Sequence, residues 1–329
     1  MATYTWIGAA GGLYATTTNW SPTGLPAAAD DIVFTGTATP NVSTTARTVR
    51  NLTVNSGTVT FSGTGIFTIQ GDINNSGTLN MTTMTVNFTG GNSQTLNLGT
   101  NSFAGCTINK TNGTNLTLGA AWNVTGTATA LLAVANGNLY TQGYTVTCRL
   151  FNASGSADRT IDLAGGAIYV TGSSGTLWNT SHTTAIGTNW TKFARSGAAY
   201  IQPSSGTATI VVTGGGIAGN YTAGATFNGV PPLFQLGNNR NYTATGQFEN
   251  LEVNGNFAGT STPQIWGSLF GTPVSYNNVT TTNPVIIGRT GVTNTVSWLA
   301  QVTSYTTQNP LSGTPTFTFN YARDRKSVV

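Results

Sequence analysis

The chain has 329 residues, of which 38% are hydrophobic and only 6% are charged. This charged fraction is far below that of an average soluble domain, but a disordered chain is excluded because 10% of the residues are aromatic and apolar residues recur at regular spacing. The net charge of +4 is dispersed, so we expect no nucleic-acid partner. No apolar run is long enough for a membrane span, and we expect no signal peptide because the first residues have neither a basic region nor an apolar stretch.

The first 40 residues carry a distinct order of motifs. Trp6-Ile7-Gly8 leads to Asn19-Trp20-Ser21 and Gly24-Leu25-Pro26, and Asp30-Asp31 comes directly before the apolar stretch Ile32-Val33-Phe34. This order resembles the opening unit of bacterial autotransporter-type β-strand repeats. The first coil of a solenoid has no neighbour on its outer side. We therefore interpret residues 1–40 as an N-terminal capping unit in which Trp6 and Trp20 cover the open end.

Residues 41–175 are predicted to form stacked coils. The phrase Asn55-Ser56-Gly57-Thr58-Val59-Thr60-Phe61 recurs 20 residues later as Asn75-Ser76-Gly77-Thr78-Leu79-Asn80-Met81. Each copy places a glycine turn before a short strand of alternating apolar and polar residues, which is typical of a half-buried strand. Recurrence at this distance favours a β-solenoid.

Later turn phrases, at Asn112–Leu116 and Asn136–Leu139, fall at uneven intervals. The predicted fold is therefore all-β, an irregular right-handed parallel β-helix, with a β-sandwich or jelly-roll as the alternative. Helical periodicity is nearly absent from the sequence.

Residues 176–323 are predicted to form a second β-rich region with more aromatic residues and loops. The stretch Asn250-Leu251-Glu252-Val253-Asn254 resembles Asn51-Leu52-Thr53-Val54-Asn55, so we expect coils here too. Several prolines after residue 260 indicate irregular loops or edge strands. Residues 324–329 break the composition abruptly, and they match a translated sequencing-adapter end. We interpret them as a sequence artefact and expect the natural sequence to depart from this one near Arg323.

The candidate catalytic groups are few. Three pairs of acidic residues are close in sequence: Asp30/Asp31, Asp158/Asp162 and Glu249/Glu252. The members of the first and third pairs are one and three positions apart, so they point to opposite faces of a strand. The context of Asp158 and Asp162 indicates a turn. His182 is the single histidine and is expected in a loop. Cys106 and Cys148 are expected to be buried free thiols, with a disulfide between coils as the alternative. We predict no catalytic residue, metal site or cofactor.

Aromatic residues are the stronger functional signal. They concentrate in the second half of the chain, where exposed rings could stack on the sugar rings of a host glycan. The alternative is that they pack in the core. The candidates for glycan stacking are Trp178, Trp190, Tyr200 and Trp266.

The body of the chain, with turns such as Asp162-Leu163-Ala164-Gly165 before Ile168-Tyr169-Val170, resembles β-helical virion proteins of tailed bacteriophages. The resemblance implies a non-enzymatic tail-fibre or appendage component located in the virion, with other virion proteins and host surface glycans as partners. Thin fibres are usually trimers, so a homo-oligomer is expected. The competing interpretations are a bacterial adhesin or autotransporter passenger at the cell surface, and a tailspike-like enzyme that degrades polysaccharide.

Overall fold

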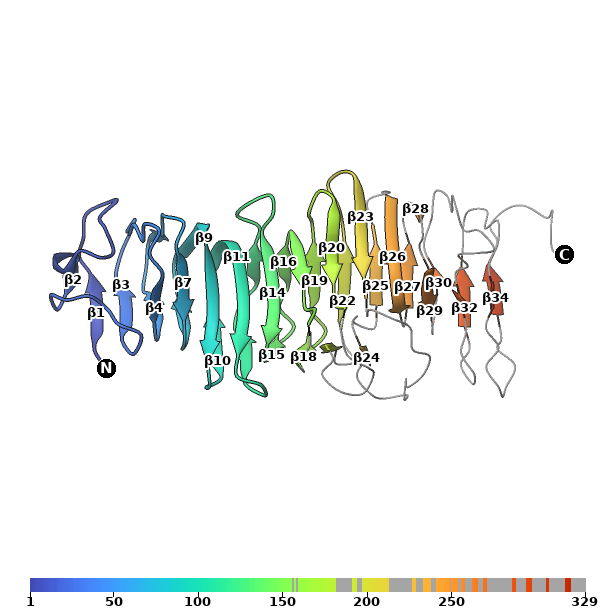
Figure 1. Ribbon diagram of the computed structural model, residues 1–329, viewed down its shortest axis with the longest axis horizontal. Helices are drawn as coiled ribbons and strands as arrows, with labels where there is room; N and C mark the ends of the chain where they lie inside the picture. Colours follow the sequence, from blue (N-terminus) through green and yellow to red (C-terminus); the bar gives the residue numbers. More distant parts are fainter. Residues whose placement is uncertain are drawn as a thin grey trace.

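The computed structural model of the protein is an elongated stack of parallel strands (Figure 1). Its described residues contain one short 3-10 helix, η1 (Thr17–Asn19), and no α-helix. The all-β parallel solenoid predicted from the sequence is therefore confirmed. The structure describes residues 1–155, 157, 159–181, 191–193, 197–212, 227–228, 233–237, 241–248, 250–253, 256–257, 262–265, 269–270, 286–287, 294–297, 306–307 and 317–320.

The first sheet contributes one strand per coil. Apart from its two end strands, β2 and β24, which pair antiparallel, its strands are parallel. In spatial order the strands are β2 (Trp20–Ser21), β1 (Thr3–Trp6), β3 (Asp31–Phe34), β5 (Leu52–Val54), β8 (Ile73–Asn75), β10 (Gln94–Asn97), β12 (Asn115–Leu118), β15 (Asn138–Tyr140), β18 (Arg159–Asp162), β21 (Thr191–Phe193) and β24 (Phe227–Asn228).

The second sheet runs beside the first along the long axis of the molecule (Figure 1). In spatial order its strands are β4 (Arg47–Val49), β7 (Ile66–Ile69), β9 (Thr78–Gly90), β11 (Thr100–Lys110), β14 (Leu131–Asn136), β17 (Leu150–Asn152), β20 (Gly175–Asn179), β23 (Thr207–Val211), β26 (Asn241–Phe248), β29 (Thr262–Ile265), β31 (Ile286–Ile287) and β33 (Thr306–Thr307), with β6 (Thr58–Thr60) beside β9 and β28 (Asn256–Phe257) beside β26.

The third sheet begins later in the chain. Its strands, in spatial order, are β13 (Trp122–Val124), β16 (Val146–Cys148), β19 (Ala167–Val170), β22 (Ala198–Ile201), β25 (Leu233–Leu236), β27 (Asn250–Val253), β30 (Leu269–Phe270), β32 (Asn294–Ser297) and β34 (Phe317–Asn320).

This third side of the solenoid extends toward the N-terminus through the long strands β9 and β11. The first part of β9 pairs with β6, and the first part of β11 pairs with β9. β13 then follows β11, because the Gly126 amide donates to the Phe103 carbonyl at 2.8 Å. We use the name third face for β6, the first parts of β9 (78–81) and β11 (100–103), and the strands of the third sheet.

Coil length varies along the stack. Thr58 pairs with Thr78, an offset of 20 residues, so the repeated phrase is one coil in register with the next. Offsets of 17 residues (Leu233 with Asn250) and 35 residues (Ala198 with Leu233) occur elsewhere. The described strands on either side of these long coils still pair in register, so the ladder continues. The boundary that the sequence analysis sets between residues 175 and 176 falls within β20. This strand pairs with β17 on one side and with β23 on the other.

The interior is one continuous hydrophobic cluster from Trp6 to Leu251. It consists of the inward-facing residues of each short strand, as period-2 alternation requires. Polar side chains also face inward at the corners between sheets. Asn75 Nδ2 donates to the carbonyls of Leu98 and Thr100, and Asn101 Nδ2 donates to those of Gly99 and Ala121. These amides satisfy carbonyl groups that the turns leave without a ladder partner.

Candidate functional site

Trp6 and Trp20 form the centre of an aromatic cluster at the first strands of the chain. Trp20 is completely buried and Trp6 is 6% exposed. Their rings meet edge to face with centroids 5.0 Å apart, and Trp20 also packs against Tyr14 (4.9 Å) and Phe34 (6.1 Å). Trp20 Nε1 donates to the Tyr14 carbonyl at 2.9 Å. The cluster lies beside β1 and β2, where the stack of described strands begins.

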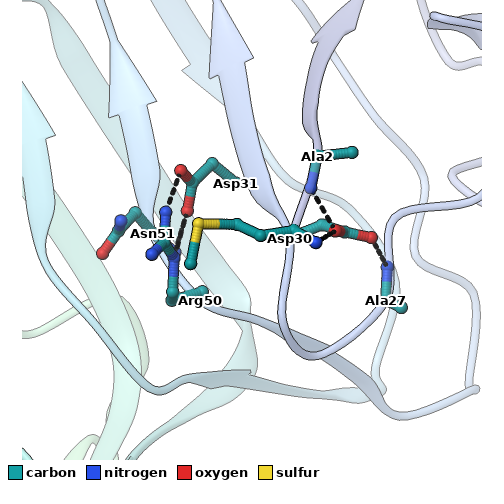
Figure 2. Close-up of polar contacts among 7 residues, drawn as sticks. Ala2, Ala27, Asp30, Asp31, Arg50 and Asn51 are labelled. Atoms are coloured by element: carbon teal, nitrogen blue, oxygen red, sulfur yellow. Dashed lines mark hydrogen bonds and ion pairs between the residues drawn. The ribbon is translucent and has the colours of Figure 1, made fainter.

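The two adjacent aspartates turn to different partners, so they do not form a catalytic pair (Figure 2). Asp30 accepts hydrogen bonds from the amides of Ala2 (2.6 Å) and Ala27 (3.1 Å), which lower the pKa of its carboxyl group. Asp31 accepts two hydrogen bonds from the Arg50 guanidinium, one of them from Nε at 2.8 Å. This ion pair lowers the pKa of Asp31. Both carboxylates therefore stabilise the first coil and do not form a catalytic site together.

The other candidate acids and the histidine give no site within the described residues. Asp162 Oδ1 accepts the Ala164 amide at 2.9 Å, as expected for an aspartate in a turn. Asp158, His182 and Glu249 lie outside the described residues, and of Glu252 only the backbone is described. Among the described residues, no group of three or more His, Cys, Asp or Glu side chains could hold a metal ion.

Trp178 does not lie on the surface, which corrects its selection as a glycan-stacking residue. Its side chain is completely buried. It stacks on Phe151 with ring centroids 4.3 Å apart and contacts Phe193 and Phe234. A ring enclosed by other core rings cannot meet a sugar. Trp190 and Trp266 lie outside the described residues.

Tyr200 is the one glycan-stacking candidate that the structure places on the outside. It pairs in register with Tyr169 of the neighbouring coil, and the two rings stack with centroids 4.8 Å apart and an interplanar angle of 22°. Both residues are partly exposed. Sequence reasoning missed Tyr169 as a partner, although both tyrosines stand in the same place within an apolar-alternating strand. Ala167 and Ala198 lie two positions before them on the same face, so small side chains stand on that side of the rings.

The sequence analysis also did not predict two charged side chains inside the solenoid, those of Lys110 and Arg159. The Lys110 side chain is 1% exposed, and its Nζ donates to Gln94 Oε1 at 2.8 Å and to the Thr89 carbonyl at 3.2 Å. Burial lowers the pKa of Lys110 to about 8. Arg159 is equally buried and donates to the carbonyls of Ala153 and Ser154. In both cases the charged group donates hydrogen bonds to backbone carbonyls, and no pattern in the sequence indicates that these two side chains are buried.

Cys106 and Cys148 are free and buried, as the sequence predicts. Burial raises the pKa of both thiols. The thiolate is the nucleophilic form, so these residues behave as small hydrophobic groups. The disulfide alternative is excluded.

Comparisons with protein-family models, with curated proteins and with solved structures gave no match. Within the described residues, no helix has the length and apolar character needed to cross a membrane. The candidate site is therefore argued from the structure alone, and it is the pair of Tyr169 and Tyr200 on the third face.

Proposed function

We propose that the protein is a non-enzymatic structural rod within an extended assembly, a phage tail fibre or similar virion appendage, and that its side contacts surface glycans. The observation that carries the proposal is the unbroken parallel stack over a single hydrophobic core. Such a stack is stiff because every coil hydrogen-bonds to the next along its length. The proposal for a virion in particular adds the resemblance of the coil sequences to β-helical virion proteins.

The arrangement of acidic residues supports a structural role over an enzymatic one. A glycosidase needs two carboxylates facing each other across a cleft. The carboxylates of Asp30, Asp31 and Asp162 instead accept hydrogen bonds from backbone amides or from Arg50. Asp30 and Asp31 thereby join segments that are distant in sequence, and Asp162 holds its own turn.

The surface adhesin is the second candidate, because the motif order of residues 6–34 resembles autotransporter-type repeats. Genomic context separates the two: portal, terminase or tail genes beside this gene are expected for a virion protein, and a translocator barrel gene for an adhesin. The direct test is mass spectrometry of purified phage particles from the source culture. Peptides of this chain in the particles support the proposal, and a chain found only in the host cell envelope contradicts it.

A further inference from the structure

Charge in the strands of the third face begins at β27, where Glu252 pairs in register with Gln235 of β25. The third-face strand segments from β6 to β25 contain no charged residue. In the other two sheets, by contrast, strands carry partly exposed charged residues, and these are Asp31, Arg47 and Asp162. A molecule that lies along the strands from β6 to β25 therefore needs no charged groups to pair with them.

The register arranges the outward side chains of this face into rows parallel to the solenoid axis. One row runs Thr58, Thr78, Thr100, and a second row beside it runs Thr60, Asn80, Ser102. After β13 the outward row continues as Thr147, Tyr169, Tyr200, Gln235. Neighbouring strands are about 4.8 Å apart, so hydroxyl and amide groups repeat at this spacing along the axis.

The tyrosine pair is the largest feature of the row. The rings stack on one another along the axis, and with alanines beside them they are flanked on one side by the smallest side chains of the face. A sugar ring offers both apolar C–H groups and hydroxyl groups, and phenol rings match both kinds of group. Thr147 and Gln235, which continue the row on either side, supply further hydrogen-bonding groups.

We infer that the third face from β6 to β25 binds a linear, uncharged polysaccharide that lies along the solenoid axis. Successive sugar units of an extended chain advance by about one strand spacing, so each coil presents a similar set of polar groups to each unit. A neutral polymer suits the strands from β6 to β25, which carry no charge, because a charged polymer would lose hydration there without gaining an ion pair. The inference rests on the glycan contact of the proposed function and adds the class of glycan and the surface that binds it.

The test measures binding of the full chain to soluble linear neutral polymers (a β-glucan and a mannan) and to the anionic polymers alginate and heparin, at low and at high salt. The face variants are Tyr169→Ala with Tyr200→Ala, and Thr78→Lys. Matched controls come from the first sheet, where Tyr140 and Thr117 also point outward and are partly exposed: Tyr140→Ala and Thr117→Lys. Circular dichroism melts confirm that each variant is folded.

We expect a neutral polymer to bind with an affinity that salt does not change. The face variants should each weaken binding about tenfold or more, which corresponds to ~1.4 kcal/mol, and the controls should leave it unchanged. Failure of both neutral polymers to bind, preference for the anionic polymers, or equal losses in the controls would overturn the inference. None of these results alters whether the chain is found in virions, so the structural role is tested separately.

Discussion

At the scale of single residues, the glycine turns decide whether coils can stack. Gly57 has a φ of +75°, in the left-handed region that favours glycine. A Cβ atom on Gly57 would lie 2.6 Å from the Thr37 backbone nitrogen of the preceding coil. Gly77 repeats this close approach one coil later, where a Cβ would lie 2.3 Å from the Gly57 carbonyl oxygen. The glycines of the repeated phrase thus lie where the backbones of neighbouring coils come into close contact.

We therefore predict that Gly57→Ala lowers the free energy of unfolding by about 1–3 kcal/mol, from backbone strain together with steric overlap. Gly36→Ala is the matched control, because a Cβ at Gly36 has no atom within 4 Å and its φ lies outside the left-handed region. Denaturant melts of the two variants provide the measurement. Equal stability of the two variants would contradict the prediction.

The ion pair between Asp31 and Arg50 predicts how stability responds to acid. Because Arg50 lowers the pKa of Asp31 in the folded state, the unfolded chain takes up the proton more readily than the folded one. The stabilisation is therefore complete above the ordinary aspartate pKa, about 3.9, and is lost as the pH falls through the lower folded value. In Asp31→Asn we expect lower stability at neutral pH and a flatter acid limb between pH 5 and pH 2.

Thermal melts across this pH range measure the effect. Arg50→Gln should flatten the same limb, and the double variant should add little to either single change, because one interaction is removed in each case. An acid limb in Asp31→Asn that is as steep as in the parent protein would show that other carboxylates carry the response.

At the scale of strands, sequence reasoning predicted regular coils well and failed where a strand departs from alternation. Val59 and Leu79 face inward, as their alternating neighbours indicate. In β20, however, the pairing register shifts between Thr176 and Trp178, and Leu177 and Trp178 are both buried. A bulge of this kind puts two successive residues on one side, and it leaves no mark in the sequence. Trp178 was chosen as a candidate because aromatic residues concentrate in the second half of the chain, and its burial fits the alternative of core packing.

Lys110 is the last residue of β11 and lies inside the fold, and this predicts a response to alkaline pH. Because burial lowers the pKa of Lys110 to about 8, the unfolded chain holds more protons than the folded chain between pH 8 and the ordinary lysine pKa of about 10.4. Stability from this group therefore rises as the pH increases through that window. We expect Lys110→Met to remove the rise.

The measurement is the difference in unfolding free energy between the parent protein and Lys110→Met at several pH values from 7 to 10. Taking the difference cancels the opposite contribution of Cys106 and Cys148, whose raised thiol pKa values favour unfolding at alkaline pH in both proteins. A difference that stays constant across the window would show that Lys110 titrates normally.

At the scale of the whole molecule, the solenoid is close to one-dimensional, because the described strands of each coil pair with those of the coils before and after it. A defect should therefore act differently at the end and in the middle of the stack. Trp20 packs in the N-terminal cap, and Trp122 packs against Phe88 and Phe103 well inside the stack. Both indoles are buried, with exposures of 0% and 1%.

We predict that Trp20→Ala and Trp122→Ala each remove about 3–5 kcal/mol of local packing, but with different ranges. In Trp20→Ala, amide hydrogen exchange should increase only in β1, β2 and β3, because an end coil can open without its successors. In Trp122→Ala, exchange should increase on both sides of β13, because an interior coil supports neighbours in two directions. Uniform loss of protection along the chain in Trp20→Ala would mean that the stack unfolds as one cooperative unit, and its stiffness would then depend on every coil at once.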